Sequence, residues 1–143
     1  MTQAILDDHL LRDLLADDPS AELADLLARH EPATTNLFLY RLSRTVVAAA
    51  GGALTGGWTS AQRRALGSKL LTLPANVTVV PIPLISYRMA ELAAAHRLST
   101  LGAECVAASE HLGAPLCVWN GDDGRHIRAA MAELGLTYLT VAR

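Results

Sequence analysis

The sequence contains few residues of several kinds, and each shortage excludes a class of protein. Its 143 residues include only two cysteines, Cys105 and Cys117, too few for a disulfide-rich secreted domain. Each cysteine lies in an apolar stretch, without the close spacing of a zinc or redox site. We therefore expect two reduced, buried thiols, as in a protein of the cytoplasm.

A membrane or secretory role also lacks support in the sequence. The Ala- and Gly-rich segment 45–58 is too short and too rich in glycine to span a bilayer. The N-terminus carries Asp7, Asp8 and Asp13 where a signal peptide would carry basic residues. These features predict a cytoplasmic protein that makes no contact with membranes.

Neither sign of charge predominates in the chain. Twelve basic and fourteen acidic side chains give a formal net charge of −2, which provides no overall attraction for a polyanion. Any contact with a nucleic acid must therefore come from a local basic patch. The length and the apolar share of 51% are enough for one hydrophobic core, so we expect a single domain over residues 1–143.

Two common catalytic motifs are missing. No Gly-x-Ser-x-Gly motif is present, so a nucleophilic serine of that type has no support. Segment 52–59 has the glycine spacing of a phosphate-binding loop, but Trp58 stands where the lysine belongs. We expect that segment to be a plain loop. The five histidines have unrelated spacings, which favours surface or helix-face positions over metal ligation.

The order of apolar residues predicts strands that alternate with helices. Valine-rich or short apolar runs predict strands over 4–7, 76–80, 115–119 and 137–141. Apolar residues at helical spacing predict helices near 10–15, 23–27, 35–50, 60–73, 84–97, 101–112 and 125–134. Gly51 and Gly52 are expected to break the third helix. This alternation implies an α/β fold with a small, mostly parallel sheet and helices on both faces.

The first predicted strand ends at two carboxylates, Asp7 and Asp8. Side chains at the carboxyl ends of parallel strands face the crevice where open α/β sheets bind ligands. The pair therefore suggests a metal or substrate site. A second interpretation stays open, because acids at strand ends, here also Asp122 and Asp123, serve equally well as loop and N-cap residues.

The C-terminal half gives a more specific indication. Residues 98–116 combine a helix of small residues with the sequence Leu-Gly-Ala-Pro-Leu entering a strand, and the sequence Asn-Gly-Asp-Asp-Gly follows at 120–124. This arrangement resembles the C-terminal half of PIN domains, above all the VapC-type toxin ribonucleases. Residues 5–11 resemble the first strand of that family with its leading aspartate. The resemblance implies a three-layer PIN-like sandwich.

In that family an acidic quartet binds one or two divalent metals, Mg²⁺ or Mn²⁺, and the metals serve RNA cleavage. Asp7 matches the first acid, and Asp122 or Asp123 matches the fourth. The second acid falls at Arg41 and the third at Gly102. Glu104 is the nearest acid to Gly102, but a helix turns about 200° over two residues, so Glu104 should point away from the site. The ligand set that the resemblance implies is Asp7, Glu104, Asp122 and Asp123, with Asp7, Asp122 and Asp123 as catalytic residues.

Arg41 changes what this crevice can do. A permanent cation at a ligand position repels a metal, and Arg41 can instead pair with Asp7 or with Asp122 and Asp123. A merely solvent-facing Arg41 is the other interpretation. Arginines also bind phosphate in a bidentate manner, so Arg41, Arg44 and Arg125 are candidate RNA-binding residues.

Three functions remain open at this point. The replaced acids favour a PIN-like protein, related to VapC-type toxins, whose catalysis is impaired or lost. The first alternative is an active Mg²⁺-dependent endoribonuclease toxin of a type II toxin–antitoxin pair. The second is a non-catalytic binding or regulatory module. The resemblance further implies a homodimer and an antitoxin-type protein partner.

Overall fold

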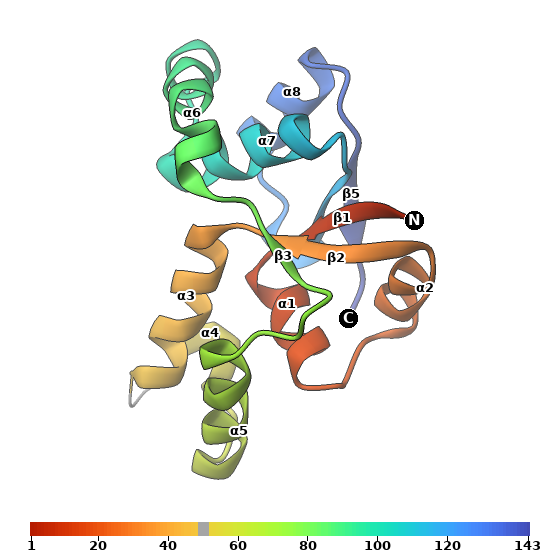
Figure 1. Ribbon diagram of the computed structural model, residues 1–143, viewed down its shortest axis with the longest axis vertical. Coiled ribbons are helices and arrows are strands. Elements are labelled where there is room, and N and C mark those ends of the chain that lie inside the picture. Colours follow the sequence, from red (N-terminus) through yellow and green to blue (C-terminus); the bar gives the residue numbers. More distant parts are fainter. Residues whose placement is uncertain (49–51) are drawn as a thin grey trace.

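The protein chain is arranged around a twisted parallel sheet (Figure 1). The computed structural model describes residues 1–48 and 52–143. Within these ranges five strands lie in the order β3-β2-β1-β4-β5, and each neighbouring pair is parallel. The strands are β1 (Thr2–Leu6), β2 (His30–Thr34), β3 (Thr78–Val79), β4 (Leu116–Trp119) and β5 (Tyr138–Val141).

Helices surround the sheet on both faces, as the sequence predicts. They are α1 (Asp8–Leu15), α2 (Ala21–Arg29), α3 (Asn36–Val47), α4 (Gly52–Thr55), α5 (Ser60–Leu71), α6 (Ile82–His96), α7 (Thr100–Leu112) and α8 (Arg125–Glu133), with a 3₁₀ turn at Asn120–Asp122. The three-layer α/β sandwich is therefore confirmed. Among the described helices, none is long and apolar enough to cross a bilayer.

Two local predictions need correction. Residues 52–55 form the short helix α4, where a plain loop is predicted. The sequence also gives no prediction of β2, an inner strand that lies between β1 and β3. The predicted end of helix 35–50 at residues 49–50, and the break at Gly51, lie outside the described residues.

Serine hydroxyls and a glycine cap two of the helices. The Ser20 and Ser99 hydroxyls accept hydrogen bonds from the backbone amides of Leu23 and Gly102, and so cap α2 and α7. Gly113 ends α7 in the left-handed region, with a φ of 60°, a conformation that glycine adopts without steric cost.

Alternating side chains of the strands build a core on each face of the sheet. Ile5, Leu116 and Val118 face the core formed with α6, α7 and α8. Leu6 and Cys117, one residue along each strand, face the core formed with α1 and α2. A third apolar cluster joins α1 to α3, α4 and α5. Figure 1 shows α3, α4 and α5 together at one end of the molecule and α6, α7 and α8 at the other.

The topology places a switch point between β1 and β4. From β1 the chain continues to β2 and β3 on one side, while β4 and β5 lie on the other. Ligands of open α/β sheets bind beyond the carboxyl ends of the strands at such a switch point. The residues that directly follow β1 and β4 therefore lie where a ligand site is expected.

Candidate functional site

Asp7 lies at the exit of β1 and caps α1. Its Oδ1 accepts a hydrogen bond from the Leu10 amide at 2.9 Å, and its Oδ2 accepts one from the Trp119 amide at 3.0 Å. The carboxyl group thus ties the end of β1 to the end of β4. The N-cap interpretation of Asp7 is confirmed. Burial raises the pKa of Asp7 to about 7, although both amide bonds favour the charged form.

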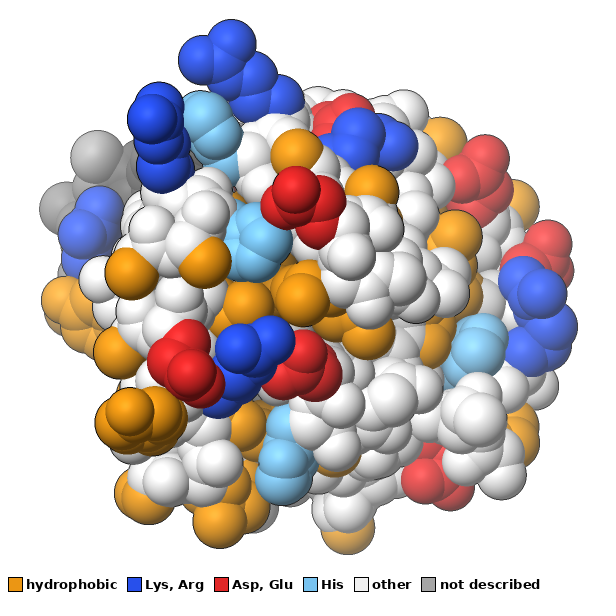
Figure 2. Space-filling model, turned by 90° about the horizontal axis from the view of Figure 1, so that it is seen from above, with side chains coloured by type: hydrophobic (Ala, Val, Ile, Leu, Met, Phe, Trp, Pro, Cys, Tyr) orange, Lys and Arg blue, Asp and Glu red, His pale blue; other side chains and the backbone are white. Residues whose placement is uncertain are grey.

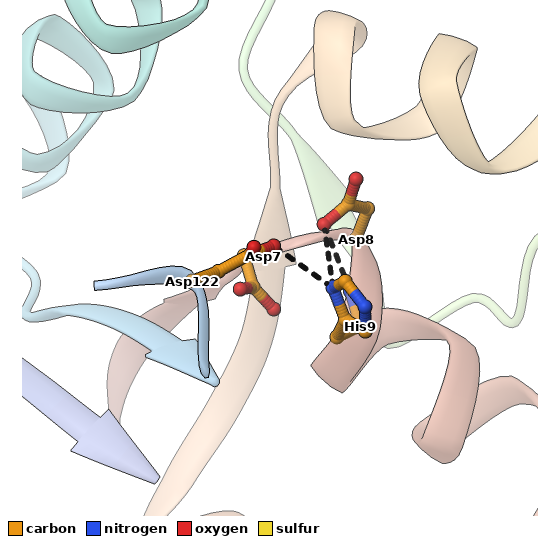
Figure 3. Close-up of side chains that lie close together, drawn as sticks. All are labelled: Asp7, Asp8, His9 and Asp122. Atoms are coloured by element: carbon orange, nitrogen blue, oxygen red, sulfur yellow. Dashed lines mark hydrogen bonds and ion pairs between the residues drawn. The ribbon is translucent and has the colours of Figure 1, made fainter. Parts of the chain in front are cut away.

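Three further side chains gather beside Asp7 (Figure 3). Atoms from Asp7, Asp8, His9 and Asp122 that can each bind a metal lie within 4.8 Å of one another. His9 Nδ1 lies 3.3 Å from Asp8 Oδ1 and 3.0 Å from Asp122 Oδ2, so the imidazole stands between two carboxylates. We call these four residues the acidic cluster. Carboxylate and imidazole groups are metal ligands, so the cluster can hold a metal ion.

His9 lies on the helix α1, as one of the two interpretations of the histidines expects, but it is not on the surface. It is 4% exposed, and its ring lies 4.6 Å from the Trp119 ring. Burial lowers the pKa of His9, but the hydrogen bond that the Asp8 carboxylate accepts from its ring and the charges of Asp8 and Asp122 outweigh burial and raise the pKa above 6.5. Protonated His9 acts as a cation inside the acidic cluster.

Arg41 supplies a second cation to the acidic cluster. It extends from α3, and its Nε lies 3.3 Å from Asp8 Oδ2. The Asp8 side chain is 1% exposed and the Arg41 side chain 44%, so the guanidinium closes the cluster from the solvent side. The sequence analysis expects Arg41 to pair with Asp7, Asp122 or Asp123. Its partner in the structure is Asp8, which follows Asp7 in the chain.

Glu104 lies apart from the acidic cluster and serves another element. It is completely buried. Its Oε1 accepts a hydrogen bond from the Leu37 amide at 2.8 Å, and its Oε2 accepts from the Asn36 amide at 3.2 Å and the Asn36 side-chain amide at 3.0 Å. Both oxygens thus satisfy the free amides at the start of α3, where a negative charge is also favoured by the helix dipole.

Asp123 is likewise engaged away from the acidic cluster. Its two oxygens accept hydrogen bonds from the Arg128 guanidinium, at 3.3 and 2.7 Å, and Oδ1 also accepts from the Tyr138 hydroxyl at 2.9 Å. Arg128 and Tyr138 lower the pKa of Asp123. Of the two neighbouring aspartates that the sequence leaves open, Asp122 is the one that joins the cluster.

Apolar side chains close the position where the resemblance expects the third acid. A Cβ atom built on Gly102 would lie 3.3 Å from Ile127 Cγ1 and 3.5 Å from Leu98 Cδ2. These contacts are tight, so a side chain at residue 102 would require Ile127 to move. The space beside Gly102 is therefore filled by apolar side chains.

A second buried charge network lies behind the acidic cluster. Arg12 is 3% exposed, donates twice to Asp13 Oδ1 and donates to the Leu54 carbonyl. Arg143 donates to the other oxygen of Asp13 at 2.8 Å, and its guanidinium lies 5.3 Å from the Trp119 ring. This network fixes the indole that packs against His9.

The remaining predicted RNA-binding residues are on the surface. Arg44 and Arg125 are both exposed, on α3 and at the start of α8. The end of the molecule that carries α6, α7 and α8 shows basic and acidic side chains next to one another (Figure 2). That face therefore offers no extended patch of one sign.

The sequence analysis identifies Asp7 and Asp122 but gives no role to His9. The position of His9 in the sequence could have indicated its place near the site. Asp8 and His9 begin the helix that directly follows a strand end, so both lie within one turn of Asp7.

Comparisons with known proteins give evidence of fold. No protein-family model matches the chain, and no curated protein sequence matches it. A solved structure described as a toxin–antitoxin complex from Klebsiella pneumoniae contains a chain that superposes with a TM-score of 0.57 and 15% sequence identity. The match covers 85% of this chain and 89% of that one. The protein therefore shares its fold with a chain of a toxin–antitoxin complex.

Proposed function

We propose that this protein is a PIN-like domain, related to VapC-type toxins, that has lost metal-dependent catalysis and acts as a binding or regulatory module. Two of the functions that the sequence leaves open are combined here: a PIN-like protein with impaired catalysis, and a non-catalytic binding or regulatory module. It is supported by what the crevice side chains contact and by the fold likeness reported above.

The observation that carries the proposal is that the acids expected to hold a metal already contact donors of the protein. Both oxygens of Asp7 accept backbone amides, and both oxygens of Glu104 accept donors at the start of α3. Asp123 accepts from Arg128 and Tyr138. A magnesium site needs several oxygen ligands at octahedral positions around one point. These three carboxylates are instead used to join elements of the fold.

The cations near the acidic cluster also oppose the binding of a metal ion. Arg41 lies 3.3 Å from Asp8, and His9, with its raised pKa, lies 3.0 Å from Asp122. A divalent metal would have to displace the guanidinium and compete with a proton for the imidazole. The donor set therefore does not fit the hard-metal catalysis of the family that the chain resembles.

The fold likeness supports the binding half of the proposal. The neighbouring structure is described as a complex of a toxin with an antitoxin. A domain of that fold that no longer cleaves RNA would retain surfaces for a partner protein. We propose an antitoxin-type protein as the partner class.

A second candidate function is an active Mg²⁺- or Mn²⁺-dependent endoribonuclease. It is favoured by one observation, the convergence of four potential ligand atoms within 4.8 Å. In that case Asp7, Asp8, His9 and Asp122 would hold the metal, after Arg41 had turned away. The metal would supply charge neutralisation at a cleaved phosphate.

An RNA cleavage assay separates the two candidates. Wild-type protein and the Asp7→Asn variant are incubated with structured and single-stranded RNA, with Mg²⁺, with Mn²⁺ or with a chelator. The proposed function predicts no metal-dependent cleavage by either protein. Cleavage by the wild type that requires metal and disappears in Asp7→Asn would establish the second candidate instead.

A further inference from the structure

The chain separates its charges along the sequence to an unusual degree. Residues 32–90 contain no Asp or Glu but six of the twelve basic side chains. All fourteen acids and the other six basic residues lie outside this stretch. The acid-free stretch therefore carries a formal charge of +6 and the rest of the chain −8, which together give the net −2.

In the fold this stretch includes α3, α4 and α5, which form one lobe below the sheet in Figure 1. We call this group of three helices the basic lobe. Arg44, Arg64 and Lys69 are exposed there, and Arg63 is half-buried. Over the described residues, none of these four side chains forms an ion pair. Their charges are thus available to an outside partner.

An apolar groove runs along the seam between α3 and α5. It has a volume of about 480 Å³ and is lined mainly by Val46, Val47, Leu70, Leu71 and Gly67. Gly67 forms part of its floor, because a Cβ there would lie 3.4 Å from Val46 Cγ1. Arg64 lies at its edge, and a second hollow of about 230 Å³ shares Val46, Val47 and Arg64 with it.

The groove is open, and its apolar side chains are unusually accessible. Val47 is 86% exposed and Leu71 89%. Large apolar side chains at the rim of a groove are typical of sites that bind another molecule. The groove and its basic surroundings therefore form one surface with an apolar floor and positive edges.

We infer that this groove binds an acidic amphipathic helix of another protein. A helix with an apolar stripe covers Val47 and Leu71, and acids beside the stripe lie against Arg63 and Arg64, which line the groove and the adjoining hollow. RNA would satisfy the arginines but leave the apolar floor without a partner. A second copy of the same lobe would bring two positive surfaces together. The inference deepens the proposed function and rests on its binding-module half.

The test uses the full chain and a defined probe. The probe is a fluorescent synthetic helical peptide of about five turns, with leucines at every third or fourth position and glutamates elsewhere. A matched peptide has lysines in place of the glutamates. Fluorescence anisotropy measures the binding of both peptides, and of a single-stranded RNA of similar length, at low and high salt.

The expected result is saturable binding of the acidic peptide alone, weakened by salt. Val47→Asp and Leu71→Asp should each weaken that binding by about tenfold or more, and Arg64→Glu by a similar factor. Leu84→Asp changes an exposed leucine on α6, 62% exposed, and Arg29→Glu changes an exposed arginine on α2. These two control variants should bind like the wild type.

Several results would overturn the inference. One is the absence of peptide binding, and another is equal binding by Leu71→Asp and wild type. RNA binding that depends on Arg64, or a homodimer in sedimentation that Leu71→Asp dissociates, would assign the surface to a different occupant. None of these results depends on RNA cleavage, so a failure here is distinguishable from a failure of the proposed loss of catalysis.

Discussion

Arg41 reaches from α3 to Asp8, with 3.3 Å between Arg41 Nε and Asp8 Oδ2. The pair joins a buried carboxylate to a guanidinium that is partly in solvent. It places a fixed positive charge where the resemblance to PIN domains expects a metal-binding acid. The main predictions concern what happens when this arrangement is changed.

Removing the Arg41 guanidinium should make the acidic cluster more attractive to a metal. In Arg41→Ala, Asp8 loses its contact with the guanidinium, and we expect Mn²⁺ to bind at least about tenfold more tightly than to wild type. Unfolding in urea should show a loss of about 1 kcal/mol, because the pair is partly exposed. Arg44→Ala, three residues along the same helix, is the matched control. Equal Mn²⁺ affinities for Arg41→Ala and wild type would show that Arg41 does not exclude the metal.

The raised pKa of Asp7 predicts a pH-dependent stability. The folded protein holds this proton up to about pH 7, whereas the unfolded chain releases it near 3.8. The stabilisation is therefore complete below pH 4 and is lost as the pH rises through 7. The raised pKa of His9 acts in the same direction, because its contribution is complete below the ordinary histidine pKa of 6.5 and is lost as the pH rises through the raised pKa.

Urea unfolding of wild type and Asp7→Asn at pH 4, 6 and 8 isolates the Asp7 contribution. Asparagine keeps an N-cap oxygen but has no charge to titrate. The stability of wild type relative to the variant should fall by about 4 kcal/mol between pH 4 and 8, because the pKa of Asp7 rises from 3.8 to about 7 on folding. A difference that stays constant or grows with pH would contradict the buried, protonated state of Asp7.

Elements with a clear apolar pattern in their own sequence were predictable. Strands that depend on pairing with distant parts of the chain were missed or given the wrong length. The sequence of β2, His-Glu-Pro-Ala-Thr, has no alternating apolar pattern, and a proline is unusual in a central strand. Pro32 nevertheless lies opposite Ala4 in the sheet. The predicted strand 76–80 shrinks to Thr78–Val79, because it pairs only with the end of β2. Long-range pairing decided both outcomes.

In the candidate site, too, local features were predictable from the sequence and long-range contacts were not. Asp7 could be found because a strand exit and an N-cap are both sequence-local features. The partner of Arg41 could not, since Asp8 and Arg41 are brought together only by the packing of α1 against α3. The role of Glu104 at the start of α3 also depends on long-range contacts. Glu104 lies 68 positions from Asn36 and 67 positions from Leu37 in the sequence, and only the fold brings them together.

Glu104 should prove to be a stability residue. Glu104→Ala leaves the Asn36 and Leu37 amides without their acceptor, and we expect a loss of about 2–4 kcal/mol in urea unfolding. Glu104→Gln keeps one acceptor and should lose less. Glu110→Ala removes an exposed acid of the same helix and should change stability by under about 1 kcal/mol. Weaker metal binding with unchanged stability in Glu104→Ala would instead identify Glu104 as a ligand.

Restoring an acid at residue 102 should be opposed by packing. Gly102→Asp forces a carboxylate against Ile127, and we expect a loss of about 1–3 kcal/mol despite the better helix propensity of aspartate. Shortening the neighbour in Gly102→Asp/Ile127→Ala should recover part of the Gly102→Asp loss, relative to Ile127→Ala alone. A double-mutant cycle by urea unfolding measures this coupling. Purely additive effects would show that Ile127 does not close the position.

Calorimetric titration of Mn²⁺ into the wild-type protein at pH 7 tests the loss of the metal site most directly. The account predicts no saturable binding up to about 1 mM metal, which corresponds to a binding free energy weaker than about −4 kcal/mol. Saturable binding with a micromolar dissociation constant, absent from Asp7→Asn, would contradict it and show that the acidic cluster is a working metal centre.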